Sequence, residues 1–241
     1  MSISQRIKFL SLRLRPWTDF KKEPKKVFRD GCDIIGEELS SYGFKYLKSK
    51  KLLTGKSKNG EFSFFIFLNT DRFNQTGKKV YMNITCAITS DGMGEFRNSY
   101  FKSVEQDNVV TSFHPGYIST KNNWIRWNLI KIHPLEIAHF LKKNALTVFD
   151  KFEHPEKLAT EFNGILPKEF DFHCRAVDFL MMYSNKEKSK DFLDNSLKEK
   201  GWSEEFDEII SLLKQGKKPE KKHRGLIILL AERALSYELK N

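Results

Sequence analysis

The chain of 241 residues contains little cysteine: only Cys32, Cys86 and Cys174. The three are odd in number and far apart, and no Cys-x-x-Cys spacing occurs. This pattern does not indicate a disulfide framework. We expect three reduced, buried thiols, which are typical of a cytosolic protein.

Long apolar runs are also absent. No run approaches the roughly 20 residues that a helix needs to span a bilayer. The start of the chain, "MSISQRIKFLSLRLRPW", has no apolar segment of the kind that a secretory signal needs. These absences predict a cytoplasmic protein without a transmembrane segment.

The common phosphate-binding and nucleophile motifs are missing. No Gly-x-Gly-x-x-Gly, Walker A or Gly-x-Ser-x-Gly occurs. Gly92 and Gly94 in "TSDGMGEF" are expected to form a turn, because no helical pattern follows closely enough to hold a phosphate. His173 and Cys174 are adjacent, and neighbouring side chains on a helix point about 100° apart. His173 is therefore poorly placed to activate the thiol.

A metal site is not indicated either. Glu136 and His139 have the spacing of half a di-iron site, but such a bundle needs a second Glu-x-x-His and two further glutamates. No second Glu-x-x-His occurs in the chain. We expect no metal, no organic cofactor and no enzyme active site.

Acidic residues are in short supply. Lys and Arg number 42 against 31 Asp and Glu, which gives a net charge of +11. The excess lies in three segments: 1–29 carries +7, 44–58 carries +6 and 214–224 carries +5, which leaves −7 for the remainder. Such clusters attract phosphates or an acidic protein, although a lysine-rich surface also serves solubility alone.

Apolar patterning predicts a helix followed by an antiparallel sheet. A helical stripe starts near Lys25, and from Val80 to Thr89 every second side chain is apolar or small, the period of a strand with one buried face. We expect strands at 44–53, 62–68, 79–90 and 124–132, and loops at 69–77 and 112–123.

The strand at 62–68 is apolar on both faces. One face is expected to be buried together with the next strand, through Phe62, Phe64, Ile66, Val80, Met82, Ile84 and Cys86. Phe65 and Phe67 occupy the other face, and a strand of this kind is usually central and covered on both sides.

From His133 onward the pattern is helical. The layout predicts an α+β fold, with an antiparallel sheet of about four strands packed by helices and an all-helical C-terminal region. The expected organisation is a basic N-terminal arm at 1–24, an α+β domain at 25–152, and a helical region at 153–241 packed on or beside it.

The stretch "YGFKYLKSKKLL" with "EFSFFIFLNTDRFN" and "VYMNITCAITS" resembles a bacterial family known only as a domain of unknown function. In that family a helix ends in Gly-Phe-Lys. A lysine-bearing strand and an aromatic-aliphatic strand ending near Asn follow, and then a strand that ends in a small-residue turn. The resemblance covers roughly residues 25–135, and the matching residues are Gly43, Phe44, Lys45, Phe64, Ile66, Asn69, Asn74 and Ile84.

That resemblance implies a small α+β domain that acts by binding. Such domains often lie beside toxin genes and are taken as immunity proteins, and the resemblance provides no catalytic residues. We therefore expect a non-enzymatic, antitoxin-like inhibitor of a cognate toxin with an acidic surface. The residues expected to contact it are Arg72, Phe73, Arg97, Tyr117 and Arg126, because arginine and aromatic side chains are the usual anchors of interfaces.

The alternative is a nucleic-acid-binding accessory protein. Basic stretches lie beside aromatic residues, and phosphates attract Lys and Arg while unpaired bases stack on rings. No RRM, KH, helix-turn-helix or zinc-finger signature accompanies them. The expected basic patch consists of Lys25, Lys26, Arg29, Lys48, Lys50, Lys51, Lys217, Lys218, Lys221 and Lys222.

Overall fold

The computed structural model describes residues 17–19, 21–101, 108–162, 167, 169–170, 172–220 and 223–240. Most of the expected N-terminal arm lies outside these ranges. Within them, no helix is long and apolar enough to cross a membrane.

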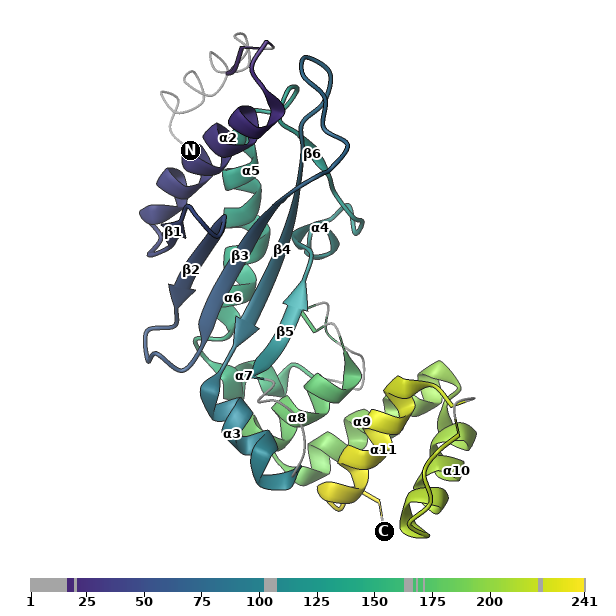
Figure 1. Cartoon of the computed structure of the whole chain (residues 1–241). Coiled ribbons are helices and arrows are strands. Elements are labelled where there is room, and N and C mark those ends of the chain that lie inside the picture. Colours follow the sequence, from purple (N-terminus) through teal and green to yellow (C-terminus); the bar gives the residue numbers. More distant parts are fainter. Residues whose placement is uncertain are drawn as a thin grey trace. The chain divides into compact units, whose positions relative to one another are not determined.

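The described strands form one sheet (Figure 1). They are β1 (Lys45–Leu47), β2 (Leu52–Lys56), β3 (Ser63–Thr70), β4 (Tyr81–Thr89), β5 (Val109–Phe113) and β6 (Trp127–Asn128). The order is β1-β2-β3-β4-β5, and β6 pairs with β4. The β1–β2, β2–β3 and β4–β6 pairs are antiparallel.

Helices precede and follow the strands along the chain and make up most of its C-terminal half. They are α2 (Pro24–Ser40), α3 (Asp91–Tyr100), α4 (Pro115–Ile118), α5 (Pro134–Leu141), the π-helix η1 (Lys142–Leu146), α6 (Thr147–Lys151), α7 (Pro155–Thr160), α8 (His173–Tyr183), α9 (Lys186–Lys200), α10 (Ser203–Lys214) and α11 (Gly225–Ser236). The expected antiparallel sheet with a helical C-terminal half is confirmed, but the count of about four strands is too low.

The chain divides into two compact units. Unit 1 comprises residues 1–56, 63–86 and 114–149, and unit 2 comprises 57–62, 87–113 and 150–241. The segments 57–62 and 87–113 thus group with the C-terminal helices rather than with the rest of the segment 25–152.

Helices cover one face of the sheet in unit 1. Phe64, Ile66, Met82 and Ile84 alternate along β3 and β4 and are all buried, as the period-2 pattern predicts. The Phe64 ring stacks on Phe149 with centroids 4.7 Å apart. Figure 1 shows α5 and α6 behind the strands. The other expected core residues, Phe62, Val80 and Cys86, are buried as well.

A glycine in α2 permits close packing against β1. A Cβ atom at Gly36 would lie 2.8 Å from the Tyr46 ring, a distance that real Cβ contacts do not reach. Glycine in a helix interior costs about 1 kcal/mol relative to alanine. Here the absence of a side chain at Gly36 allows Tyr46 to lie directly against the helix.

The opposite face of β3 is only partly covered, so the expected cover is wrong at Phe67 and incomplete at Phe65. Phe65 is half-buried, and the Phe67 side chain is 37% exposed. Their rings stack on each other with centroids 6.2 Å apart. β3 is central in the strand order, as expected, but apolar side chains on a second face do not require a second layer.

Several local expectations are also wrong. The predicted turn at Gly92 and Gly94 begins α3, where the Ser90 side chain accepts a hydrogen bond from the Met93 N–H at 3.1 Å and caps the helix. The expected strand 44–53 is the β1–β2 hairpin, and only Trp127–Asn128 of 124–132 is a strand. β5, within 108–113, was not expected.

Aromatic side chains fill the core of unit 2. Phe179 contacts the rings of Phe152, Phe162 and Phe170, with centroids between 5.2 and 6.0 Å apart. Phe62 joins them through Phe152 at 5.4 Å. Such pairs contribute about 0.5–1.5 kcal/mol each beyond the area that they bury.

A buried carboxylate links three helices of unit 2. Asp178 on α8 is 0% exposed. It accepts hydrogen bonds at 2.7 Å from Nε of Arg97 on α3 and from Nε of Arg233 on α11. The Tyr237 hydroxyl donates to it at 2.8 Å. Burial raises the pKa of Tyr237, so this hydroxyl keeps its proton and remains a donor.

We expect Asp178→Asn to lower the free energy of unfolding by about 3–5 kcal/mol, because it removes the counter-charge that Asp178 gives to the buried Arg97 and the half-buried Arg233. Chemical denaturation measures this loss. The matched control is Asp194→Asn, which removes a half-exposed partner of Lys240 in the same unit and should cost less than about 1 kcal/mol. Equal effects of the two changes would contradict the assigned role of Asp178.

Candidate functional site

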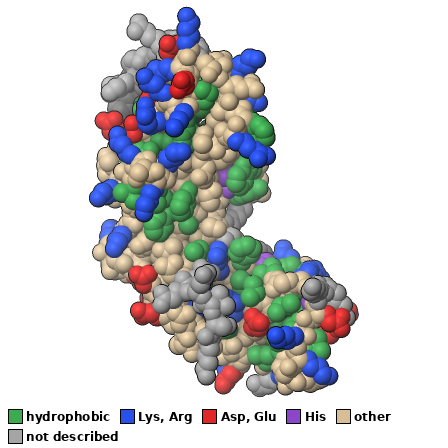
Figure 2. Space-filling view, in the orientation of Figure 1, with side chains coloured by type: hydrophobic (Ala, Val, Ile, Leu, Met, Phe, Trp, Pro, Cys, Tyr) green, Lys and Arg blue, Asp and Glu red, His purple; other side chains and the backbone are tan. Residues whose placement is uncertain are grey.

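Charge separates between the two units. Unit 1 holds 22 Lys and Arg against 8 Asp and Glu, a net charge of +14, whereas unit 2 holds 20 against 23, a net charge of −3. Figure 2 shows Lys and Arg side chains gathered over the part of unit 1 that holds α2 and the β1–β2 hairpin. Unit 1 is therefore the part that attracts an anionic partner.

A cavity of about 360 Å³ lies in this basic region. Its walls come from the first half of α2, from the β1–β2 hairpin and from the connection that follows β3. We call it the basic pocket. The lining residues are Pro24, Lys25, Phe28, Arg29, Cys32, Tyr46, Lys48, Lys51, Thr70, Asp71, Arg72 and Asn74.

The wall of the basic pocket is apolar and its rim is cationic. Phe28 and Cys32 are buried on α2, and Tyr46 lies within hydrogen-bond reach of the Cys32 thiol. Burial raises the pKa of Cys32 to about 12, so the thiol keeps its proton at neutral pH. The Lys51 amine lies 5.4 Å from the centre of the Phe28 ring, a cation–π contact.

Only part of the expected basic patch meets at this pocket. Lys25, Arg29, Lys48 and Lys51 line it. Lys26 and Lys50 are exposed neighbours that do not. The remaining members belong to another part of the chain: Lys217 and Lys218 lie in unit 2, and Lys221 and Lys222 lie outside the described residues.

Beside the pocket, three expected contact residues form one surface. Arg126 pairs with Asp71 and lies 4.5 Å from the centre of the Tyr81 ring. The Arg72 guanidinium lies 4.7 Å from the Phe73 ring centre, and the Phe73 side chain is 61% exposed. The connection between β3 and β4 and the segment before β6 therefore meet at Asp71.

Tyr117 and Trp124 form an exposed aromatic pair on the loop that leads to Arg126. Their ring centroids are 6.5 Å apart, and the two residues are 45% and 50% exposed. Trp124 is two residues from Arg126 along the chain. We call Asp71, Arg72, Phe73, Tyr117, Trp124 and Arg126 together the loop surface, because they belong to the two connections that the Asp71–Arg126 pair joins.

His114 supports the loop surface from beneath. Its ring stacks on Trp124 with centroids 4.1 Å apart. Nδ1 accepts from the Gly116 N–H at 3.0 Å, and Nε2 lies 3.1 Å from the Ile125 carbonyl oxygen. Because an acceptor is needed at Nδ1, the ring is neutral with its proton on Nε2.

A glycine makes this loop possible. A Cβ atom at Gly116 would lie 2.2 Å from the Asn123 carbonyl oxygen. Only glycine allows the two backbone segments to approach this closely. The loop between β5 and β6 is thus folded back on itself, and it holds Tyr117 and Trp124 at its exterior.

The expectation that Arg97 contacts a partner is wrong. Arg97 lies on α3 in unit 2, where its side chain is buried and bonded to Asp178. Its counter-charge is 81 positions away in the sequence, so no local pattern could reveal the pair.

Trp124 was expected on a strand and was not named as a contact residue. It lies before β6 and is half-exposed instead. The polar run "STKNN" directly before it is a loop signal. An aromatic residue that ends such a run was the available sign of a surface role.

Among the described residues, no group of three or more His, Cys, Asp or Glu side chains is placed to hold a metal ion. Cys32, Cys86 and Cys174 are free and buried, and burial raises the pKa of each thiol. His139 faces Glu38, with Nε2 and Oε1 3.9 Å apart.

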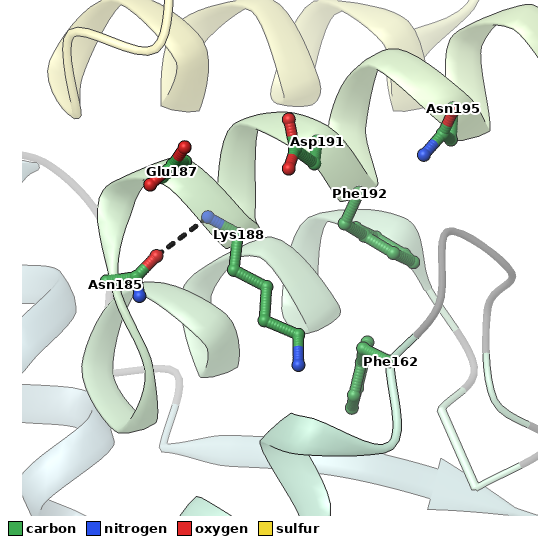
Figure 3. Close-up of a pocket in the computed structure, with 7 residues that line it drawn as sticks. All are labelled: Phe162, Asn185, Glu187, Lys188, Asp191, Phe192 and Asn195. Atoms are coloured by element: carbon green, nitrogen blue, oxygen red, sulfur yellow. Dashed lines mark hydrogen bonds between the residues drawn. The ribbon is translucent and has the colours of Figure 1, made fainter.

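A second cavity of about 360 Å³ lies in unit 2 beside the start of α9 (Figure 3). Among the described lining residues Lys188 is the one cation, and its amine donates to the Thr160 carbonyl oxygen at 3.0 Å. Asn185 caps α9 by accepting from the Lys188 N–H at 2.8 Å. Glu187 and Asp191 add two carboxylates to its lining. The Asn185 contact caps α9, and the Lys188 amine is bonded to the backbone at the end of α7.

Comparisons of the chain with protein-family models, with curated proteins and with solved structures find no match. The case for a function therefore depends on the residues and geometry of the chain itself.

His114 makes stability depend on pH. Burial lowers the pKa of His114 below its ordinary value of about 6.5. Below pH 6.5 the unfolded chain therefore binds a proton that the folded chain does not, so the free energy of unfolding falls as the pH falls. Burial lowers the pKa of His133 and His173 in the same direction.

We expect the free energy of unfolding, measured by denaturant titration, to be lower at pH 5.5 than at pH 7.5. The change His114→Asn keeps a side-chain acceptor for the Gly116 N–H but does not titrate. That variant should lose less stability between the two pH values than the parent protein. An equal loss would show that His114 does not contribute to the pH dependence.

Proposed function

We propose that the protein is a non-enzymatic binding protein that occludes a protein partner through the loop surface of unit 1. The observation that carries the proposal is the exposure of Phe73, Tyr117 and Trp124 on the two connections that also carry Arg72 and Arg126. Aromatic and arginine side chains dominate the binding energy of protein interfaces.

The loop surface is held in place before a partner binds. The Asn74 side chain accepts from the Tyr81 N–H at 2.7 Å and donates to the Thr70 hydroxyl at 3.0 Å. The Asp71 carboxylate accepts from the Phe73 N–H at 2.8 Å and pairs with Arg126. A preorganised surface loses less conformational entropy on binding.

The charge of unit 1 favours a partner with an acidic surface. A net charge of +14 on unit 1 accelerates association with such a surface and disfavours basic partners. Together with the resemblance to toxin-associated domains, this supports an immunity protein that neutralises a cognate toxin in the cytoplasm.

The test uses Phe73→Ala, with Phe172→Ala as the matched control. Both rings are exposed, at 61% and 47%, and only Phe73 belongs to the loop surface. Each change should alter stability by less than about 0.5 kcal/mol. Phe73→Ala should cost about 1–4 kcal/mol in affinity for a toxin encoded beside this chain's gene, measured by calorimetry of the purified pair.

Growth provides the second measurement. Co-expression of the parent chain or of Phe172→Ala should rescue cells from that toxin, and Phe73→Ala should rescue less. If the parent chain forms no complex with any neighbouring gene product, the immunity proposal fails. If Phe73→Ala binds as tightly as the parent chain, the loop surface is not the interface.

Nucleic-acid binding is a second candidate, favoured by the concentration of charge in unit 1. If phosphate contacts drive this binding, affinity for single- or double-stranded DNA or RNA should fall steeply with salt. The expected log-log slope is about −0.7 to −0.9 per phosphate contact. A flat fluorescence-anisotropy titration with all four nucleic acids at low salt would eliminate this candidate.

A further inference from the structure

The basic pocket gathers cations from separate segments of unit 1. They come from three separate places: Lys25 and Arg29 from α2, Lys48 and Lys51 from the β1–β2 hairpin, and Arg72 from the β3–β4 connection. Like charges four residues apart on a helix, such as Lys25 and Arg29, repel each other. A bound polyanion would relieve this repulsion.

Little negative charge offsets these cations. Asp71 is the one carboxylate among the described lining residues, and it is engaged by Arg126. Lys48 is paired with Asp33, with Nζ and Oδ1 3.2 Å apart. Within the described part of the chain, no ion pair to an acidic side chain is formed by Lys25, Arg29, Lys51 or Arg72.

Lys51 adopts a backbone conformation that lysine rarely takes. Its φ is +52°, in the left-handed region that favours Gly and Asn. The turn would be relaxed by either of those residues. With lysine at this position, the amine lies over the Phe28 ring at the wall of the pocket instead.

The pocket also has an apolar wall that a simple phosphate would not need. Pro24 and Tyr46 are half-buried and present carbon and ring surface to the pocket, and Phe28 and Cys32 are almost fully buried behind them. A volume of about 360 Å³ falls within the range of small-ligand sites, about 300–1,000 Å³. The pocket also adjoins the first turn of α2, a helix of 17 residues whose dipole favours negative charge at that end.

We propose that the basic pocket binds a nucleotide, with its phosphates held by Arg29, Lys51 and Lys25 and its base against Tyr46. The nucleotide is either free or the 5′-phosphorylated end of a strand, since both present the same phosphate and base. This site does not depend on the protein partner proposed above, and the isolated protein suffices to test it.

The experiment compares two double variants that remove the same number of charges. Arg29→Gln with Lys51→Asn changes two lining residues. Lys26→Gln with Lys50→Asn changes their neighbours on the same helix and hairpin, which do not line the pocket. Asn tolerates the left-handed backbone at position 51, so the first pair should fold. Thermal unfolding of both variants checks this.

ADP is the probe, titrated by calorimetry into the full chain at about 150 mM salt. The lining variant should bind ADP at least about tenfold more weakly than the parent protein, because each charge-assisted phosphate contact is strong. The neighbour variant should change affinity by less than about threefold. Equal weakening by both variants would show attraction to net charge alone and would overturn the proposal, as would no binding of ADP to the parent protein.

Two further ligands identify the source of the phosphate and test the apolar wall. Inorganic pyrophosphate should bind more weakly than ADP, and equal affinity would overturn the assignment of a base to Tyr46. A 5′-phosphorylated dinucleotide that binds more tightly than ADP would identify a strand end as the ligand. The reverse order would identify a free nucleotide, and either order supports the site.

Discussion

The one-sided burial of the sheet is the constraint on which unit 1 depends. Phe64, Ile66, Met82 and Ile84 are buried on one face, and the Phe64–Phe149 stack joins that face to the helical layer. This leaves the other face of β3 in contact with solvent. It also places the start of α2 beside the β1–β2 hairpin, where the basic pocket forms. The binding surfaces are thus consequences of the same packing that forms the core.

Unit 2 depends on a different interaction. The Asp178 carboxylate holds α3 and α11 through two arginines and a tyrosine, and it does so in a core otherwise filled by phenylalanine rings. Paired charges in such a setting define which helices meet and at which positions, because any other arrangement leaves a buried charge without a partner. The excess of lysine and arginine side chains that could bind anions lies in unit 1. The Asp178 network in unit 2 holds helices together.

Patterns with a short range in sequence were predictable. The alternation from Val80 to Cys86 correctly identified buried residues of β4, because period 2 is a property of the strand itself. The start of α3 was not predicted, because Gly92 and Gly94 indicated a turn and the capping by Ser90 was not considered. A Cβ atom at Gly94 would lie 3.3 Å from that of Asn108, so the reason for that glycine is a contact distant in the sequence.

The candidate site was predictable only in part, for the same physical reason. Lysine runs and exposed aromatic residues are visible in the sequence, but their convergence is a property of the tertiary structure. Arg72 and Lys25 line the same pocket because the β3–β4 connection returns to α2. Arg97 does not reach the surface because it is buried in an ion pair with Asp178. Trp124 became part of the loop surface through its stack on His114.

Because the two units alternate along the chain, recombination cannot easily exchange one of them. Each unit is assembled from three separate segments, and the β4 strand passes from one into the other at Cys86. No single break in the chain yields a complete unit, so neither can be exchanged as a module by recombination at one boundary. Substitutions in the basic surface of unit 1 and in the helical core of unit 2 are therefore transmitted together.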